Sequence, residues 1–273
     1  MMYRFFLTIN SIVIDLLNNS LIKDLELLAK NNKQVKKALK FYKEQNHQEQ
    51  VHNEFDKDIA KTFFSDKYNL LQKSHEDFSE FKKVFDYCRK FQDRDVPLGE
   101  RLLAYAFIEC IVFFPFFAWI IRHRFSGNIQ GTVSGNHWVC IEEAMHVRGH
   151  SYIYQLFGNV KETRARKICD DLIFLVKDMW NSRILKYGDN NVNGFTLEMV
   201  YEYIDHLEEM ILSFTGFSNE NTKKNPFKYM DYIKTYTQAN FFERRVIEYT
   251  NIDDFKYKEG FFNNCIEIKS NIS

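Results

Sequence analysis

The sequence predicts an all-α fold, a helical bundle, and three observations indicate it. Only ten glycines and three prolines occur in 273 residues, too few for the many turns of a sheet-rich protein. Charged residues make up 27% of the chain and recur at short helical intervals, as is typical of long helices. Apolar residues repeat at spacings of three and four along most of the chain, which is the period of one helix face.

Helical segments are expected along nearly the whole chain. Each is an apolar periodic stretch that ends at a short polar break. They cover residues 3–30, 34–64, 68–92, 99–124, 134–157, 160–186, 195–215 and 226–234. The breaks have the length of ordinary bundle turns, so we expect one domain over residues 1–249. Residues 250–273 lose the periodicity and are predicted to form a mobile C-terminal tail.

Charge and cysteine content exclude several classes of function. The net charge is zero with both signs mixed along the chain, so no field would gather nucleic acid or anionic lipid. The five cysteines stand singly without a C-x-x-C pair, which indicates a reducing compartment.

The apolar N-terminus lacks the basic region and cleavage site of a signal peptide. A cytoplasmic protein is expected.

The apolar run FIECIVFFPFFAWII carries one carboxylate, Glu109, near its middle. Counted from Leu102, the run is long enough to span a bilayer. A membrane helix is disfavoured, because Glu109 would lie mid-span, Pro115 would break the helix, and charged residues flank both ends. A buried carboxylate instead needs a cation or hydrogen-bond donors to offset its lost hydration.

Two Glu-x-x-His pairs provide partners for such a carboxylate. Glu143 and His146 stand three residues apart on one predicted helix, and Glu49 and His52 repeat the spacing upstream. Residues at i and i+3 project from the same helix face. Two such helices with single carboxylates from other helices form the dinuclear sites of ferritin-like bundles. Oxygen and imidazole ligands suit iron or manganese better than structural zinc.

A second interpretation is that these residues bind no metal, because Glu-x-x-His spacings also arise by chance. Glu44 and His47 form a third copy, about 140° around the helix from the second, so both cannot face one core. Glu109 alone could be a carboxylate that is hydrogen-bonded within an ordinary core. Four further candidates are expected to be structural or exposed: His137, Glu142, His150 and His206.

Longer motifs then resemble a known family. In order and at close to family spacing, the chain carries GERLLAYAFIECIVFF, VCIEEAMH, NPFKYMDYI and NFFERRVIEY. These resemble the ERxxAFAxxEGIFFSxxF, RDExxH, NPFxxM and NFFExRVxEY segments of the small, radical-generating subunit of class I ribonucleotide reductase. The resemblance covers most of the chain, and the last motif is the most specific.

The resemblance implies a ligand set and a register. Phe41 and Tyr42 match a Phe-Tyr pair that precedes the family's first Glu-x-x-His, which selects Glu49 and His52 over Glu44 and His47. The implied metal ligands are therefore Glu49, His52, Glu109, Glu143 and His146. Phe113 and Phe117 match apolar residues around the family's radical. Pro115 frees a backbone carbonyl one turn earlier, so a kink or bulge is expected beside the site.

Two departures from the family pattern affect the metal site itself. The family's first ligand is an aspartate, and Asn10 stands at that position in FFLTINSIV. Asn10 is expected as the sixth ligand, since its side chain can donate a carbonyl oxygen, although it brings no negative charge. Asp15 could replace it only after a shift of helix register. The family's radical-bearing tyrosine corresponds to Asp56 in HNEFD. Asp56 cannot hold a phenoxyl radical, and it could be an additional ligand or a hydrogen-bonded carboxylate near one metal.

A third departure concerns radical transfer between subunits. The family's chain of residues runs from an upstream Trp through the Asp of RDE to a tail Tyr. Here no Trp precedes Asn10, Glu142 replaces that Asp, and Tyr249 matches the tail Tyr.

The implied function is that of a divergent or N-terminally shortened ribonucleotide reductase small subunit. Its dinuclear iron centre, or a Mn/Fe or Mn/Mn pair, would generate an oxidant that passes to the large subunit for deoxyribonucleotide synthesis. Two alternatives stay open. The chain could be a metal-poor scaffold that pairs with a competent small subunit, or a ferritin-like di-metal oxidase with its own substrate. The expected partners are a large subunit and a second small subunit, as homodimer or heterodimer.

Overall fold

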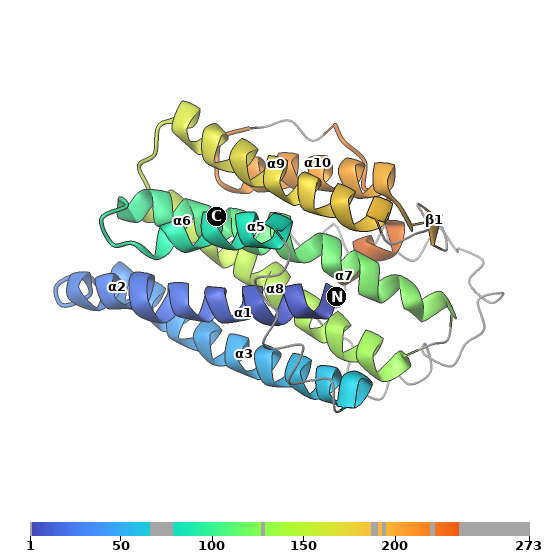
Figure 1. The fold of residues 1–273 in the computed structure, drawn as a ribbon. Helices are drawn as coiled ribbons and strands as arrows, with labels where there is room; N and C mark the ends of the chain where they lie inside the picture. The colour runs from blue at the N-terminus through green and yellow to red at the C-terminus, as the bar shows by residue number, and fades with distance from the viewer. Residues whose placement is uncertain are drawn as a thin grey trace, which may run out of the picture. The chain divides into compact units, whose positions relative to one another are not determined.

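The prediction of an all-α fold is confirmed by a computed structural model, which describes residues 2–65, 79–126, 129–186, 191–192, 195–218 and 222–234 (Figure 1). The helices are α1 (Met2–Leu16), α2 (Ile22–Leu28), α3 (Lys33–Phe64), α5 (Ser79–Arg89), α6 (Leu98–Phe107), α7 (Phe114–Ile121), α8 (Gln130–Phe157), α9 (Glu162–Lys186) and α10 (Leu197–Phe214). Two π-helical segments, η1 (Leu17–Leu21) and η4 (Ile108–Phe113), join α1 to α2 and α6 to α7. Short 3-10 segments are η3 (Lys90–Gln92), η5 (Arg122–Ser126) and η6 (Lys228–Lys234), and β1 (Asn191–Val192) pairs antiparallel with β2 (Phe195–Thr196).

Most predicted helix limits lie within two residues of these bounds. The helix expected from 134 begins at Gln130. The helix expected from 195 begins at Leu197, because Phe195 and Thr196 pair in the short ladder and the Thr196 hydroxyl accepts the Met199 N–H as an N-cap. Residues 228–234 form a 3-10 helix. Part of the segment expected at 68–92, residues 68–78, lies outside the described residues.

The long helix α3 starts where its sequence provides a cap. Asn32 is extended, and its side-chain oxygen accepts hydrogen bonds from the N–H groups of Gln34 and Val35. These are donors that the first helical turn leaves unsatisfied. The helix then runs without interruption to Phe64, so that Glu49, His52 and Asp56 lie on one continuous face.

Helices α1 and α3 lie side by side, α6 and α7 pack along α8, and α9 packs with α5 and α10 (Figure 1). Helix α8 also packs on α3, and two glycines of α8 allow the close approach. A Cβ atom at Gly135 would lie 2.0 Å from the ring of Phe55, and one at Gly149 would lie 2.2 Å from the ring of Phe41. The rings of Phe41 and Phe55 on α3 therefore occupy the space that a side chain at either position would need.

The apolar run around Glu109 forms the centre of the core. Two helical stretches are long and apolar enough to cross a membrane by length and composition, Phe5–Leu28 and Leu98–Arg124. Within the folded chain, 94% of the most apolar window of the second stretch is buried. A helix enclosed by other helices has no surface left for lipid, so its hydrophobicity is that of a core helix.

The bulge that Pro115 predicts is present. The proline ring removes a backbone donor and clashes with the preceding turn, and the six residues before Phe114 form the π-helical segment η4. A π-bulge rotates the side chains on either side relative to a regular helix. Glu109 lies within this segment and is completely buried.

Contacts divide the chain into two units, Met1–Thr235 and Tyr236–Ser273, and all described residues belong to the first. The predicted boundary at residue 249, the tail from residue 250 and Tyr249 fall outside the described residues.

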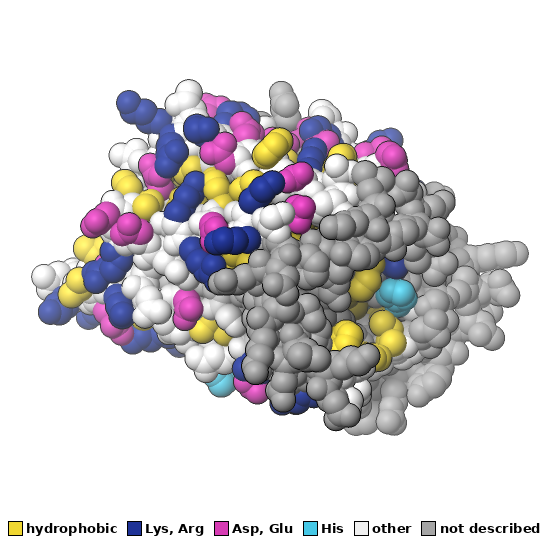
Figure 2. Space-filling model, viewed as in Figure 1, with side chains coloured by type: hydrophobic (Ala, Val, Ile, Leu, Met, Phe, Trp, Pro, Cys, Tyr) yellow, Lys and Arg dark blue, Asp and Glu magenta, His cyan; other side chains and the backbone are white. Residues whose placement is uncertain are grey.

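On the face shown in Figure 2, the described basic and acidic side chains are interspersed. That distribution agrees with the absence of a single-sign field in the sequence.

Candidate metal centre

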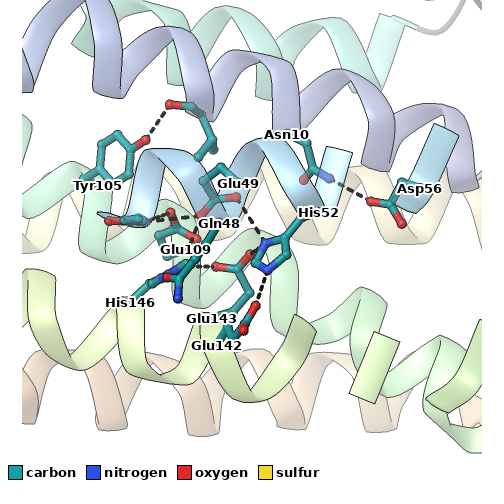
Figure 3. A network of polar contacts seen from close by, with 12 residues as sticks. Asn10, Gln48, Glu49, His52, Asp56, Tyr105, Glu109, Glu142, Glu143 and His146 are labelled. Atoms are coloured by element: carbon teal, nitrogen blue, oxygen red, sulfur yellow. Dashed lines mark hydrogen bonds and ion pairs between the residues drawn. The ribbon is translucent and has the colours of Figure 1, made fainter. Parts of the chain in front are cut away.

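Three segments bring four potential ligands together. Helix α3 contributes Glu49, η4 contributes Glu109, and α8 contributes Glu143 and His146. One ligand atom from each of these side chains lies within 4.8 Å of all the others. All four side chains are buried. Figure 3 shows them converging between the helices, with His52 beside them.

The two imidazoles face the carboxylates through the same ring nitrogen. Nδ1 of His52 lies 3.1 Å from Oε1 of Glu143 and 3.5 Å from Oε2 of Glu49. Nδ1 of His146 lies 3.0 Å from Oε2 of Glu143 and 3.1 Å from Oε1 of Glu49. Each histidine therefore points Nδ1 at both Glu49 and Glu143, at similar distances.

The opposite ring nitrogen of each histidine is held by a second residue. Nε2 of His52 donates to Glu142 at 2.6 Å, and Nε2 of His146 donates to the side-chain oxygen of Gln48 at 2.8 Å. Histidines that bind metals usually donate their other N–H to a carboxylate or carbonyl, which fixes the tautomer and the ring orientation. Nδ1 is thereby the nitrogen of each ring that faces the cluster, where it could bind a metal ion after losing its proton.

Gln45 orients the carboxylate that comes from η4. Its side-chain amide donates to Oε1 of Glu109 at 3.0 Å and to Oε1 of Glu49 at 3.3 Å. Gln45 stands one turn before Glu49 on α3 and is buried. A single amide group thus links the glutamates of two different segments.

The electrostatics of the cluster favour a cation. Burial, together with repulsion by Glu143 and Glu49, holds the pKa of Glu109 well above its usual range. Burial alone would lower the histidine pKa values, but the surrounding carboxylates raise the pKa of His52 to about 12 and that of His146 to about 9. Protons therefore occupy the positions where a metal ion would neutralise the same carboxylates.

Two buried carboxylate oxygens without a hydrogen bond test whether the residues fit a metal. Oε2 of Glu49 and Oε2 of Glu109 are buried and have no hydrogen-bond partner. A buried carboxylate oxygen without a donor is costly unless a cation lies beside it. Three carboxylates and two imidazoles are the donor mixture of non-haem iron and manganese sites. The residues therefore fit a bound metal pair.

The sixth predicted ligand, Asn10, pairs with Asp56. The Asn10 amide on α1 donates to Oδ2 of Asp56 on α3 at 2.8 Å, and both side chains are buried. Burial raises the pKa of Asp56 to about 8, although His52 and Asn10 oppose the shift. Figure 3 shows this pair to one side of the cluster. Asp15, the possible replacement, is exposed.

Phe113 and Phe117 line the adjoining aromatic core. Phe6 of α1 packs edge-on against both rings, with centroids 5.6 Å and 5.4 Å apart. Phe6 lies one turn before Asn10, so these three rings close the apolar side between α1 and α7.

Glu44 and His47, the other Glu-x-x-His pair of α3, are exposed and lie away from the cluster's buried side chains.

The remaining candidates have structural partners. His137 contacts Arg124 through Nδ1 at 3.0 Å, and Nδ1 of His206 donates to the Lys223 carbonyl at 2.8 Å. Glu142, expected to be structural or exposed on composition grounds, is half-buried and holds His52.

His150 was expected to be structural or exposed, and it is completely buried beside the cluster. Nδ1 lies 3.1 Å from the Tyr42 hydroxyl, and Nε2 lies 3.9 Å from Oε1 of Glu109. Burial, with repulsion by His146, holds the pKa of His150 well below its usual range. Gln45, Gln48 and His150 were not predicted as site residues. Spacing could have indicated two of them, because Gln45 stands four residues before Glu49 and His150 four residues after His146.

Comparisons with known proteins agree with this geometry. Residues 2–226 match the family model described as ribonucleotide reductase, small chain. A ribonucleoside-diphosphate reductase small chain of Acanthamoeba polyphaga mimivirus is 28% identical over 222 residues, which cover 80% of this chain and 52% of that protein. The vaccinia virus (strain Western Reserve) small chain is 26% identical over 232 residues, covering 84% and 72%.

A solved structure shares the fold. The ribonucleotide reductase Rnr4 homodimer from Saccharomyces cerevisiae gives a TM-score of 0.59 at 19% identity, over 89% of this chain and 74% of that one. The chain spans about half the length of the mimivirus relative. The match to the family model ends at residue 226, so it does not include the NFFERRVIEY motif.

Proposed function

Because this chain belongs to the ribonucleotide reductase small-chain family, we propose that it serves as the small subunit of a ribonucleoside-diphosphate reductase. In this role it would generate the oxidant that a large subunit uses in deoxyribonucleotide synthesis. One observation carries the proposal: the ligand atoms of Glu49, Glu109, Glu143 and His146 lie within 4.8 Å of one another in a buried site. The relatives that match most of the chain are named as such small chains.

The proposed cofactor is a dinuclear iron centre, with Mn/Fe and Mn/Mn pairs as alternatives. When bound, such a pair would supply the redox chemistry with dioxygen that side chains lack. The proposed ligands are Asn10, Glu49, His52, Glu109, Glu143 and His146. Asn10 would offer a neutral carbonyl oxygen, since its side-chain oxygen has no hydrogen-bond partner.

The residues around the ligands would keep the site ready for the metals. Gln48 and Glu142 hold the Nε2 protons of His146 and His52, which leaves Nδ1 of both rings free to bind. Gln45 holds the Glu109 carboxylate toward Glu49. The buried rings of Phe113 and Phe117 exclude water from the side that faces α1, which strengthens every charge interaction inside.

The proposed partners are a large subunit and a second small subunit. Trp138, Met145 and Tyr152 of α8 stand seven residues apart and are 42%, 48% and 63% exposed. A seven-residue spacing places them on one helix face, and large exposed apolar side chains in a row mark an association surface. We propose this stripe, together with Val51 on the neighbouring helix α3, as the face that meets the second small subunit, in a cytoplasmic protein that binds no nucleic acid.

A second candidate function is a metal-poor scaffold for a competent small subunit. The Asn10–Asp56 pair favours it, because the site lacks one carboxylate ligand of the family pattern and Asp56 cannot be the family's tyrosine. On this alternative the apolar stripe would meet the competent subunit, and the cluster would stay metal-poor. The remaining alternative, a di-metal oxidase that acts on its own substrate, would need no large subunit.

Metal analysis and reductase assays together separate these functions. Purified protein is loaded with iron(II) or manganese(II), and metal per chain is measured by elemental analysis. Nucleotide reduction is then measured with the cognate large subunit. The proposal expects two metal ions per chain and reduction above that of the large subunit alone. Fewer than one metal per chain, with reduction only after addition of a competent small subunit, would favour the scaffold.

The third Glu-x-x-His copy supplies a matched control. Glu49→Gln should lose metal, because it removes a charge from the buried cluster, whereas Glu44→Gln changes an exposed residue of the same helix. Equal metal loss in both variants, or in neither, would contradict the assignment of Glu49 as a ligand.

A further inference from the structure

An apolar cavity of about 40 Å³ lies between α7, α8 and α10. Its lining includes Phe114 of α7, Val147 of α8, and Leu207 and Met210 of α10. Arg148, which also lines it, is exposed, whereas Val147 and Leu207 are buried. The cavity therefore leads from the surface of the bundle toward its core.

The size and lining of the cavity select the class of ligand. It is larger than the roughly 10–15 Å³ that one water-sized molecule needs, and apolar cavities of this kind stay dry and bind small uncharged molecules such as xenon. His206, a polar residue of the lining, uses Nδ1 to donate to the Lys223 carbonyl at 2.8 Å. A small, uncharged, apolar molecule therefore fits this cavity, and a charged molecule of nucleotide size does not.

Leu207 connects the cavity to the segment that carries Glu109. Its side chain lines the cavity, and its main-chain carbonyl accepts the thiol of Cys110, whose sulfur lies 3.8 Å away. Cys110 directly follows the proposed ligand Glu109 in η4. Leu207 and Cys110 are both buried. The cavity is thus one contact away from the residue next to Glu109.

Helix α8 brings the same cavity close to a second proposed ligand. Cys140, Ala144 and Val147 stand at i, i+4 and i+7, so they share one face of the helix. Ala144 and Val147 line the cavity. Cys140 is buried three residues before Glu143, and burial together with repulsion by Glu143 holds the pKa of its thiol well above the usual range. The thiol therefore stays neutral and behaves as a small apolar group.

The neighbours of the cluster on its α3, α1 and α7 sides are polar or closely packed. Gln48 and Glu142 hydrogen-bond to the two histidines between α3 and α8, and the Asn10–Asp56 pair lies on the α1 side. On the α7 side, the Phe117 ring packs against neighbouring phenylalanine rings with centroids 5.4 Å and 6.5 Å away. An apolar molecule would have to break hydrogen bonds or displace rings on these sides. On the α10 side it meets a cavity and then small thiol side chains.

We propose that this cavity is the site through which dioxygen enters, and that the gas passes from it to the metal pair between Leu207, Cys110 and Cys140. Dioxygen is small, uncharged and apolar, as the cavity requires. No bond forms or breaks in the cavity. The proposal rests on the proposed function, because the metal centre would consume the dioxygen, whereas binding within the cavity needs no metal. The two can therefore be tested apart.

Xenon tests the cavity without the metal, because xenon occupies dry apolar cavities and scatters X-rays anomalously. Crystals of the full-length protein, metal-free and iron-loaded, are pressurised with xenon. An anomalous peak between Phe114, Leu207 and Met210 is expected in both forms. Absence of a xenon peak at this position from both forms would overturn the proposal.

Ala144→Leu tests whether dioxygen uses the cavity. The larger side chain would fill part of the cavity, whereas Ser213→Leu adds similar bulk at an exposed position of α10 outside the lining. Both variants are loaded anaerobically with iron(II) and mixed with dioxygen, and the formation of iron(III) is followed by absorbance. Ala144→Leu should lose the xenon peak and oxidise its iron several-fold more slowly at unchanged iron content. Ser213→Leu should match the wild type in xenon binding, iron content and oxidation rate.

Each contrary result has a distinct meaning. Oxidation at the wild-type rate in an Ala144→Leu protein that has lost the xenon peak would overturn the role of the cavity and leave the metal centre intact. A wild-type protein that holds xenon but binds no iron would overturn the proposed function and, with it, the entry of dioxygen by this route. If Ala144→Leu does not fold, Met210→Trp, which fills the cavity from α10, takes its place in the same comparison.

Discussion

The Asn10 amide donates a 2.8 Å hydrogen bond to the Asp56 carboxylate, joining α1 to α3 inside the core. These are the two positions at which the metal-site motifs depart from the family pattern, and they contact each other. An aspartate at position 10 could not donate this hydrogen bond. The two substitutions therefore form one structural unit, in which the amide partly offsets the cost of burying Asp56.

Asn10→Asp should destabilise the metal-free protein. It would place two buried carboxylates in contact and remove the only donor to Oδ2 of Asp56 that the described residues provide. The expected loss is about 1–3 kcal/mol, the usual cost of an unsatisfied buried polar group. Urea unfolding in the presence of a chelator measures it. Asn19→Asp, at an exposed position beside Lys23, should change stability by less than about 0.5 kcal/mol; equal effects would contradict the importance of the pair.

Gly149→Ala should weaken the contact between α3 and α8. The new Cβ would lie 2.2 Å from the Phe41 ring, so the ring or the helices must move at a cost of about 1–3 kcal/mol. Gly131→Ala, in the same helix with nothing within 4 Å, should be neutral or stabilise by up to about 1 kcal/mol. Thermal unfolding compares the two. Similar melting temperatures would show that α3 and α8 are not in close contact at Gly149.

Gln48→Leu should weaken metal binding without removing a ligand. Gln48 holds Nε2 of His146 at 2.8 Å, and loss of such an outer partner typically lowers metal affinity by about 10–100-fold. Gln50→Leu, at an exposed position of the same helix, is the control. Competition with a coloured chelator measures both affinities. Unchanged affinity in Gln48→Leu would show that Gln48 does not orient His146 for metal binding.

Metal binding should strengthen as pH rises from 6 to 8, and the metal-free protein should weaken. The pKa of His146 is raised from its ordinary value of 6.5 to about 9. Its stabilising contribution is fully present below pH 6.5 and is lost as pH rises through 9. The raised pKa of Asp56, about 8, acts in the same direction, because its ionised form is disfavoured in the folded state.

A bound metal reverses this trend because it displaces those protons. The difference in melting temperature between iron-loaded and chelator-treated protein should therefore increase with pH. Calorimetry in two buffers of different ionisation enthalpy should detect proton release on binding. A difference that shrinks as pH rises would show that protons and metal do not compete for these side chains.

The sequence predicts those candidate ligands whose spacing follows from helix geometry. Helix geometry indicates only that the two Glu-x-x-His pairs of this helix, about 140° apart, cannot both face the core. The resemblance at Phe41 and Tyr42 selected Glu49 and His52, and these two residues are buried. The bulge at η4 followed from Pro115, since proline cannot continue the hydrogen-bond pattern.

Contacts between helices were harder to predict. Nothing in the sequence shows that Gln48 reaches across to His146, or that His150 meets Tyr42, because each contact depends on how α3 and α8 pack. The Asn10–Asp56 contact was hidden for the same reason. Periodicity also cannot distinguish an α-helix from a short 3-10 segment, as residues 228–234 show.

Anomalous diffraction from crystals of the iron-loaded protein tests the central claim most directly. The account predicts two anomalous peaks between the carboxylates of Glu49, Glu109 and Glu143, one within bonding distance of Nδ1 of His52 and the other within bonding distance of Nδ1 of His146. No peak at this position, or glutamates that lie too far apart to share a cation, would contradict it.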